Sequence, residues 1–236
     1  MSSLRIEQPR AGYRVSMEPF LLASFTCLRK EGRGVDLGTG SGVLAVLLAR
    51  RYPALQIVGI EIQEDLVTMA RKNVESNGVE KQVEILRGDF RQARELWPSG
   101  SFDVAISNPP YRSAQSGRLS PDPGRALARH EVAMSLADLG EACAYLLKDH
   151  GKLFLTYHPA RLAELSRVCG EKGLTIKRLQ FVHARPGAQA KMVLIEAVKK
   201  GREGLQVSSP FFVYREGGNY SAEMKAVYGL DDPLIS

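Results

Sequence analysis

Short apolar runs and longer amphipathic stretches alternate along the first half of the chain. Four apolar runs have the length of buried strands, at 35–37, 57–60, 83–86 and 102–106. Between them, residues 43–50 and 64–77 carry apolar side chains at the spacing of a helix, and Asn77-Gly78 is a typical helix end. Strands that alternate with helices predict a parallel sheet that is covered by helices on both faces.

The same alternation returns after a polar segment. Residues 112–125 are rich in Gly, Pro and Ser, which predicts a long loop. Beyond this loop, the pattern predicts helices at 126–147 and 161–172 and strands at 151–157, 174–183 and 191–198. The stretch Arg185-Pro186-Gly187 predicts a return between the last two strands. We therefore predict an α/β fold whose mostly parallel seven-stranded sheet ends in an antiparallel hairpin.

The composition is that of a globular protein. The chain has 236 residues, of which 44% are hydrophobic and 25% are charged, so a sizeable core can form. No apolar run approaches the roughly 20 residues that a membrane-spanning helix needs, and the N-terminus lacks the apolar segment of a secretory signal. Three scattered cysteines fit neither a zinc site nor a disulfide framework. We predict a cytoplasmic protein without a bound metal.

The residues with candidate chemistry share one position, the end of a predicted strand. Four groups are placed in this way: 36–42, Glu61, Asp89 and 108–111. Ligands of open α/β sheets lie outside the carboxyl ends of the strands, where the strand order reverses. The sequence therefore predicts one site that is assembled from all four groups.

A glycine-rich turn with an acidic neighbour follows the first strand. Gly38, Gly40 and Gly42 permit a tight turn and a close approach of a ligand to the backbone. No Gly-Lys-Ser/Thr follows, so the turn is not a Walker loop, and its spacing is not that of a dinucleotide fingerprint. Asp36 beside the turn suits a ligand that carries a cationic amine, and S-adenosylmethionine is such a ligand.

The next two strand ends carry one carboxylate each. Glu61 can accept both hydroxyls of a ribose, and Asp89 can accept the exocyclic amine of an adenine. Each residue alone is also compatible with a solvated strand end. Acidic residues at three successive strand ends make a nucleoside-containing ligand the better interpretation.

Motifs in the chain resemble those of a known family in their order and spacing. DLGTGSG (36–42), IEIQ (60–63), GDF (88–90) and NPPY (108–111) are similar to the motifs of class I S-adenosylmethionine-dependent methyltransferases. NPPY is similar to the signature of the amino-methyltransferases among them. The end segments QPRAGYRVSMEPFLLASF (8–25) and NYSAEMKAVY (219–228) resemble those of the bacterial valine-tRNA adenine-N6 methyltransferases, which modify the adenine 3′ of the anticodon.

This resemblance implies a Rossmann-like fold, S-adenosylmethionine as the cofactor and RNA, in particular tRNA, as the partner. It also implies three parts: an N-terminal arm or cofactor flap (1–32), the methyltransferase domain (33–200) and a C-terminal extension packed on the same domain (201–236). The cofactor-binding residues that it implies are Tyr13, Arg14, Asp36, Gly38, Thr39, Gly40, Gly42, Glu61, Ile62, Asp89, Phe90 and Asn108.

The segment NPPY has a direct chemical interpretation. The amine of adenine is a poor nucleophile, because its lone pair is delocalised into the ring. The side-chain oxygen of Asn108 and the carbonyl of Pro109 can each accept one of its N–H groups, orient the lone pair and stabilise the growing positive charge. Pro110 keeps this elbow rigid, and Tyr111 can stack on the flipped base. We take Asn108, Pro109, Pro110 and Tyr111 as the catalytic residues.

Basic residues follow this elbow. The net charge of +6 and the pI near 9.3 favour a polyanionic partner. The candidate contacts with phosphate groups are Arg112, Arg118, Arg125 and Arg129.

Four other functions remain open on the sequence. The same elbow would serve guanine-N2 methylation of ribosomal RNA, adenine-N6 methylation of DNA or glutamine-N5 methylation of a protein release factor. The first glycine of the turn is residue 38, which leaves no room for the helical substrate domain that usually precedes the release-factor enzymes. A subunit that binds the cofactor without catalysis is the fourth alternative, and Asn108 and Tyr111 argue against it.

Overall fold

A computed structural model of the chain describes residues 4–7, 16–28, 31–109 and 135–229. Its helices are α1 (Glu18–Phe25), α2 (Val43–Arg51), α3 (Glu64–Ser76), α4 (Ala93–Leu96), α6 (Leu136–Leu146), α7 (Leu162–Glu171) and α8 (Ala222–Tyr228), with short 3-10 turns at Phe90–Gln92 and Pro159–Arg161. Its strands are β1 (Glu31–Leu37), β2 (Ala54–Glu61), β3 (Val83–Arg87), β4 (Phe102–Ser107), β5 (Leu147–Tyr157), β6 (Leu174–His183), β7 (Ala190–Lys199), β8 (Gln206–Val207) and β9 (Phe211–Phe212).

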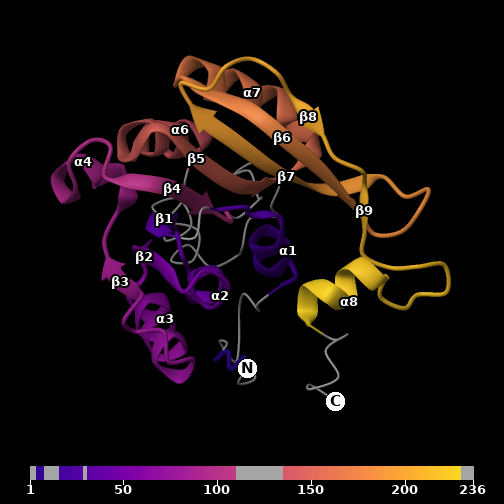
Figure 1. Ribbon diagram of the computed structural model, residues 1–236, viewed down its shortest axis with the longest axis horizontal. Helices are drawn as coiled ribbons and strands as arrows, with labels where there is room; N and C mark the ends of the chain where they lie inside the picture. Colours follow the sequence, from indigo (N-terminus) through magenta and orange to yellow (C-terminus); the bar gives the residue numbers. More distant parts are fainter. Residues whose placement is uncertain (1–3, 8–15, 29–30, 110–134, 230–236) are drawn as a thin grey trace, which may run out of the picture.

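The strands form one sheet in the order β3-β2-β1-β4-β5-β7-β6-β8, and β9 pairs with β6 (Figure 1). The first five strands along this order are parallel, and β7 is antiparallel to both of its neighbours. The predicted seven-stranded sheet with a closing antiparallel hairpin is thereby confirmed. β8 and β9 were not predicted, because each has only two residues and pairs with β6 alone.

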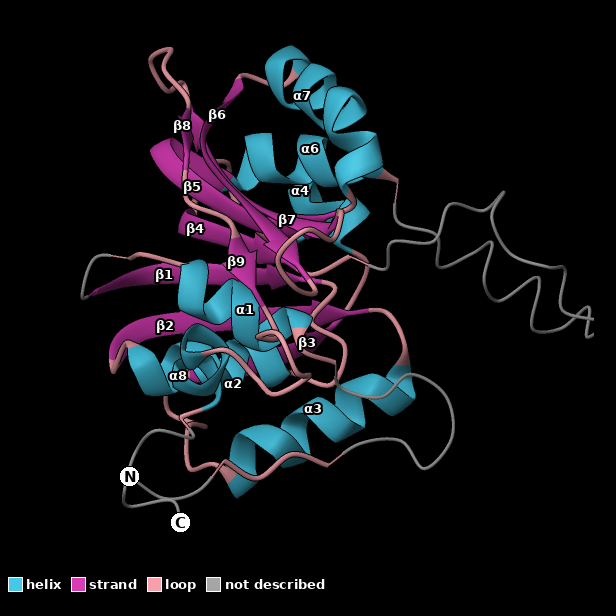
Figure 2. Ribbon diagram, turned by 90° about the vertical axis from the view of Figure 1, so that its right-hand side faces the viewer, coloured by secondary structure: helices cyan, strands magenta, loops and turns pink. Residues whose placement is uncertain are grey.

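Helices cover both faces of the sheet, as predicted (Figure 2). Buried residues alternate between the two faces along a strand. In β4, Val104 and Ile106 belong to the core under α1, α2 and α3, whereas Ala105 belongs to the core under α4, α6 and α7. This alternation is the two-residue period of a strand that is buried on both faces. Among the described helices, none combines the length and the apolar character that a bilayer crossing requires.

Several boundaries differ from the prediction, and β1 and β2 begin four and three residues earlier than predicted, at Glu31 and Ala54. The predicted helix at 126–147 is α6 from Leu136 onward, where Ser135 and Asp138 form a capping box, and its earlier part lies outside the described residues. β5 begins at Leu147 and not at residue 151. His150 has φ 62°, and the register between β4 and β5 shifts between Phe102 and Val104. The first residues of β5 therefore form an irregular part of the strand. They are polar, so the sequence pattern did not predict a strand there.

α1 was not predicted. Five of its residues are buried, among them Leu21 and Leu22 at 0% exposure, and it lies against α2 and α8. A short helix that is buried nearly all round has no polar stripe, so the sequence shows no helical period there. The division into parts at 1–32, 33–200 and 201–236 stays a prediction.

Candidate functional site

The four predicted groups lie side by side along one edge of the sheet. In the order β3-β2-β1-β4, the carboxyl ends carry Asp89, Glu61, the turn 38–42 and Asn108. The register pairs Asp36 with Gly59 on one side and with Ile106 on the other. The strand order reverses between β1 and β4, which is where ligands of open α/β sheets bind.

The glycine turn is built from hydrogen bonds to the neighbouring strand. The N–H groups of Gly38 and Thr39 both donate to the carbonyl of Ile60 at 3.0 Å. Gly40 has φ 58°, and a Cβ added to it would meet no atom within 4 Å. Gly42 has φ 78°, and its Cβ would lie 3.0 Å from that of Ala70. Gly42 is therefore needed for the packing of α2 on α3, whereas Gly40 leaves open space in which a ligand can approach the backbone.

The carboxylate of Glu61 is buried beside this turn at 6% exposure. Its Oε2 accepts the N–H of Gly40 at 3.0 Å, and its Oε1 accepts the N–H of Gln63 at 2.9 Å. A carboxylate has about four acceptor positions, so each oxygen keeps capacity for a ligand hydroxyl. This geometry fits the predicted contact with a ribose.

Asp36 is deeper, at 1% exposure, and its Oδ2 accepts the hydroxyl of Thr39 at 2.6 Å. Burial raises the pKa of Asp36 to about 7, the hydrogen bond from Thr39 opposes this rise, and the charge of Glu61 adds to it. A cationic group bound here would be attracted by the charge of Glu61 and would favour the ionised form of Asp36. A ligand with an ammonium group, such as S-adenosylmethionine, fits this environment.

The buried acid has a measurable consequence for stability. The ordinary pKa of Asp36 is 3.8, so between about pH 4 and pH 7 the folded chain holds this proton and the unfolded chain does not. The free energy of unfolding of the ligand-free protein should therefore fall as the pH rises, by about 1.5 kcal/mol between pH 5.5 and 7. In Asp36→Asn this contribution should be absent, which denaturant titrations at several pH values can measure.

Asp103→Asn is a matched control for that measurement. Burial raises the pKa of Asp103, but hydrogen bonds from Lys148 and from the N–H of Arg33 outweigh burial, and the pKa lies below its ordinary value. Its replacement should leave the decline in stability between pH 5.5 and 7 in place. If Asp36→Asn also keeps the decline, then Asp36 does not hold a proton in this range.

Asp89 is engaged by its neighbour in the chain. Its Oδ1 accepts the N–H of Arg91 at 2.9 Å, and both oxygens accept from the guanidinium of Arg91. Burial raises the pKa of Asp89, but these hydrogen bonds and the charge of Arg91 outweigh it and hold the pKa below its ordinary value. Asp89 is thus ionised, and the amine of a ligand would donate to a carboxylate that also accepts hydrogen bonds from Arg91. The predicted contact with adenine stays a prediction.

Two further predicted cofactor residues lie at the same edge. Ile62 follows β2 and is 38% exposed, whereas Phe90 follows Asp89 and is buried at 8%. An exposed apolar side chain beside a polar site suits the face of a flat ring. Phe90 belongs to the core and can only support the turn that carries Asp89.

Asn108 is held from the strands on both sides of β4. The hydroxyl of Ser107 donates to the carbonyl of Leu37 in β1 at 2.8 Å. The hydroxyl of Thr156 in β5 donates to Oδ1 of Asn108 at 2.5 Å, and Thr156 is fully buried. Asn108 is half-buried and Pro109 is buried. The amide and the carbonyl predicted to accept an amine are thus fixed at the point where the strand order reverses.

Thr156 was not singled out in the sequence. A signal was present, because Thr156 is a polar residue near the end of the apolar run LFLTY, in the same position relative to its strand as the other site residues. Several predicted site residues lie outside the described residues: Tyr13, Arg14, Pro110, Tyr111, Arg112, Arg118, Arg125 and Arg129. Their predicted roles stay predictions.

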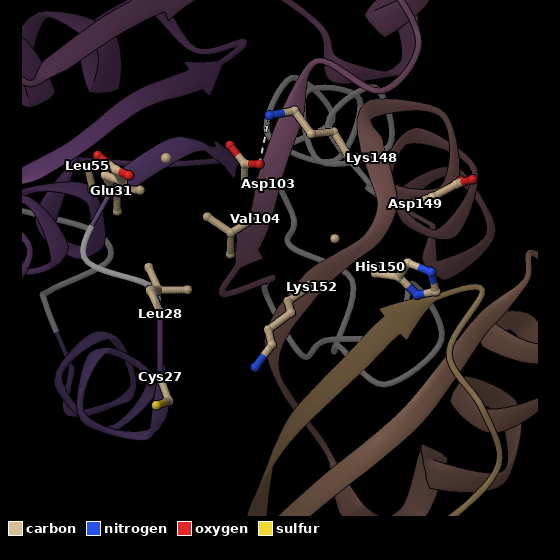
Figure 3. Close-up of a pocket in the computed structure, with 12 residues that line it drawn as sticks. Cys27, Leu28, Glu31, Leu55, Asp103, Val104, Lys148, Asp149, His150 and Lys152 are labelled. Atoms are coloured by element: carbon tan, nitrogen blue, oxygen red, sulfur yellow. Dashed lines mark hydrogen bonds and ion pairs between the residues drawn. The ribbon is translucent and has the colours of Figure 1, made fainter.

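A recess of about 650 Å³ lies at the opposite edge of the sheet (Figure 3). It is lined by the amino ends of β1, β4 and β5, including Glu31 and Val104, and the ion pair of Lys148 with Asp103 at 2.7 Å stands at its rim. Polar groups in it do not converge on one point, and ligands of such sheets bind at the carboxyl edge. The recess is therefore separate from the candidate site.

Known proteins resemble this chain over most of its length. Residues 18–122 match the family described as "Methyltransferase small domain". A tRNA1(Val) (adenine(37)-N6)-methyltransferase of Tolumonas auensis is 31% identical over 199 residues, which cover 84% of this chain and 81% of that protein. A protein of the same name from Porphyromonas gingivalis is 30% identical over 197 residues, which cover 81% of this chain and 76% of that protein.

The fold has a counterpart among solved structures. The crystal structure described as a predicted O-methyltransferase of Agrobacterium tumefaciens has a TM-score of 0.73 to this chain. The two are 23% identical, and the match covers 90% of this chain and 96% of the other. At this identity the likeness supports the fold and says nothing about the substrate.

Proposed function

Because the chain belongs to the family of the tRNA1(Val) (adenine(37)-N6)-methyltransferases, we propose that it methylates the N6 atom of adenine 37 in a valine tRNA. It is an S-adenosylmethionine-dependent N-methyltransferase. The observation that carries the choice of an amine as the acceptor is the fixed amide of Asn108, one strand away from the glycine turn.

The protein's part in the reaction is to orient the amine. An amide oxygen can accept two hydrogen bonds, and Oδ1 of Asn108 accepts the hydroxyl of Thr156. With the carbonyl of Pro109, it can accept the two N–H groups of adenine N6. Both acceptors strengthen their hydrogen bonds as positive charge grows on the nitrogen, so they stabilise the transition state more than the ground state.

The cofactor side is held by the groups at the ends of β1 and β2. Bound S-adenosylmethionine supplies a methyl group on a positively charged sulfur. Glu61 would bind the ribose, the backbone at Gly40 would allow its close approach, and Asp36 would favour the ammonium group. Tyr111 and the arginines Arg112, Arg118, Arg125 and Arg129 remain our proposed contacts with the base and the phosphates.

Thr156 should act on the rate through Asn108. Removing its hydroxyl takes one orienting hydrogen bond from the amide, and a neutral hydrogen bond is worth about 0.5–1.5 kcal/mol. In Thr156→Val we expect the single-turnover rate of methyl transfer to fall by up to about tenfold, with unchanged affinity for S-adenosylmethionine. Thr156→Ser keeps the hydroxyl and should stay close to the wild-type rate. A wild-type rate in Thr156→Val would mean that this hydrogen bond does not orient the amide.

The direct test of the proposed function is methyl transfer to a defined RNA. Isotope-labelled S-adenosylmethionine is incubated with the protein and a transcript of valine tRNA, and the product is digested to nucleosides. We expect N6-methyladenosine, and none in a transcript in which adenine 37 is replaced by guanine. Parallel reactions with ribosomal RNA, DNA and release factor test the other amine acceptors. Transfer to one of these and not to the tRNA would contradict the proposal.

A further inference from the structure

The hairpin of β6 and β7 extends beyond the neighbouring strand at the carboxyl edge. β5 makes its last pair between Tyr157 and Val193, whereas β6 and β7 pair on to His183 and Ala190. Three further residues at about 3.3 Å each carry the hairpin roughly 10 Å past the end of β5. Because β6 is parallel to β5, the turn at 184–189 lies on the same edge of the sheet as Asn108.

A second segment is bound to this hairpin. β9 pairs with Val182 and His183, and the N–H groups of Val213 and Tyr214 donate to the carbonyls of His183 and Ala184 at 3.0 and 2.8 Å. Figure 1 shows the β6–β7 turn and the loop before α8 projecting on the same side of the molecule. We call residues 183–192 and 211–221 together the hairpin surface.

Basic side chains on the hairpin surface have no partner within the part of the chain that the structure describes. Arg185, Lys191 and Arg215 are exposed, and none of their side chains makes a hydrogen bond or an ion pair with a described residue. Elsewhere most exposed basic residues are paired, as Arg167 is with Glu171. The only acidic residue of the hairpin surface is Glu216, so three positive charges face one negative charge. Unpaired cations suit a polyanionic partner.

Aromatic rings accompany these charges. Tyr214 and Tyr220 are stacked, with ring centroids 5.3 Å apart and planes 11° apart, and both are half-exposed. The backbone holds the pair in place, because Tyr214 and Tyr220 form an antiparallel bridge. Flat rings next to unpaired cations are the combination that binds bases and phosphates of a nucleic acid.

We infer that the hairpin surface binds the RNA substrate away from the methylated base, an inference that rests on the proposed function. From β4 to β6 there are three strand steps and to β9 four, which at about 4.8 Å each make roughly 14–19 Å across the sheet. Together with the roughly 10 Å by which the hairpin projects, the surface lies about 17–22 Å from Asn108. In a stacked strand, one nucleotide spans about 3.4 Å. The surface therefore contacts the backbone about five to six nucleotides from the target, in the stem next to its loop.

The test is a charge reversal with a control at the opposite edge. The variant carries Arg185→Glu and Arg215→Glu. The control carries Lys81→Glu and Arg202→Glu, two exposed basic residues beyond the amino ends of the strands whose side chains pair with no residue that the structure describes. Binding is measured by fluorescence anisotropy at several salt concentrations. One probe is the 17-nucleotide anticodon stem-loop of valine tRNA, and the other is a pentanucleotide with the target adenine at its centre.

We expect the variant to bind the stem-loop at least about tenfold more weakly, with a log–log salt slope reduced by one to two units, since each lost phosphate contact lowers it by somewhat under one. The control should bind it within about twofold of the wild type, and neither variant should change binding of the pentanucleotide. An unchanged affinity of the variant for the stem-loop, or an equal loss in the control or with the pentanucleotide, would overturn the inference.

Thermal melting verifies that both variants are folded. If the wild-type protein binds the stem-loop but does not methylate the full valine-tRNA transcript, the proposed function fails while the surface stands. If the wild-type protein methylates the full transcript but does not bind the stem-loop, the inference fails while the proposed function stands.

Discussion

Replacement of Asn108 by alanine should slow methyl transfer by about a hundredfold or more while the dissociation constant of S-adenosylmethionine stays nearly unchanged. The amide acts on charge that develops on the amine in the transition state. The amide is fixed by Thr156, and in our proposal it lies on the acceptor side of the site, whereas the cofactor would be held from β1 and β2. Single-turnover rates and calorimetric titration of the cofactor measure the two quantities independently.

A comparison with Tyr111 sharpens this test. If Tyr111 stacks on the base, Tyr111→Ala should lose about 1 to 3 kcal/mol of RNA binding, and Tyr111→Phe should lose much less. An orienting group should not tolerate Ala, whereas a stacking group should tolerate any flat ring. If Asn108→Ala methylates RNA at nearly the wild-type rate, then the segment NPPY is only a stiff turn, and the interpretation as an amino-methyltransferase site is wrong.

Replacement of Glu61 by alanine should weaken the binding of S-adenosylmethionine at least about tenfold, because a lost charged hydrogen-bond acceptor costs roughly 1.5–3 kcal/mol. The structure adds a second reason. Both oxygens of Glu61 also accept backbone N–H groups, from Gly40 at 3.0 Å and from Gln63 at 2.9 Å. In Glu61→Ala, these two hydrogen bonds to the backbone are lost in addition to the proposed contact with the ribose.

Glu61→Gln separates these two effects. It keeps one oxygen for the N–H of Gly40 but loses the charge and one of the two acceptor atoms. We expect its affinity for the cofactor to lie between those of the wild type and Glu61→Ala, as measured by calorimetry on proteins whose melting temperatures have been compared. An unchanged affinity in Glu61→Ala would remove Glu61 from the cofactor site.

The sequence predicted the parts of the structure in which local pattern and tertiary packing agree. β6 was predicted with its observed bounds, and the strand ends at Asp36, Glu61, Asp89 and Asn108 do meet along one edge. Such positions are predictable because parallel strands in one sheet must end at the same edge.

The remaining features depend on contacts between distant segments. The polar Thr156 near the end of an apolar run is only a weak local signal, and its role is visible once β5 lies beside β4. α1 has no helical period because it is buried on nearly all sides. The start of β5 is polar and passes through a left-handed His150, so its sequence does not look like a strand. The partner of Asp89 is only two residues away, but the sequence alone does not show whether Arg91 turns towards it.

The point between β1 and β4, where the strand order reverses, separates two parts of the chain to which we assign different functions. The strands up to β3 carry the residues assigned to the methyl donor, and those from β4 onward carry the amide and the hairpin surface assigned to the acceptor. The donor is common to many enzymes, whereas acceptors differ between them. A lineage with this arrangement can acquire a new substrate by changes after residue 107 alone, while the first half is inherited intact. Divergence in specificity among such enzymes should therefore be concentrated in the second half of their genes.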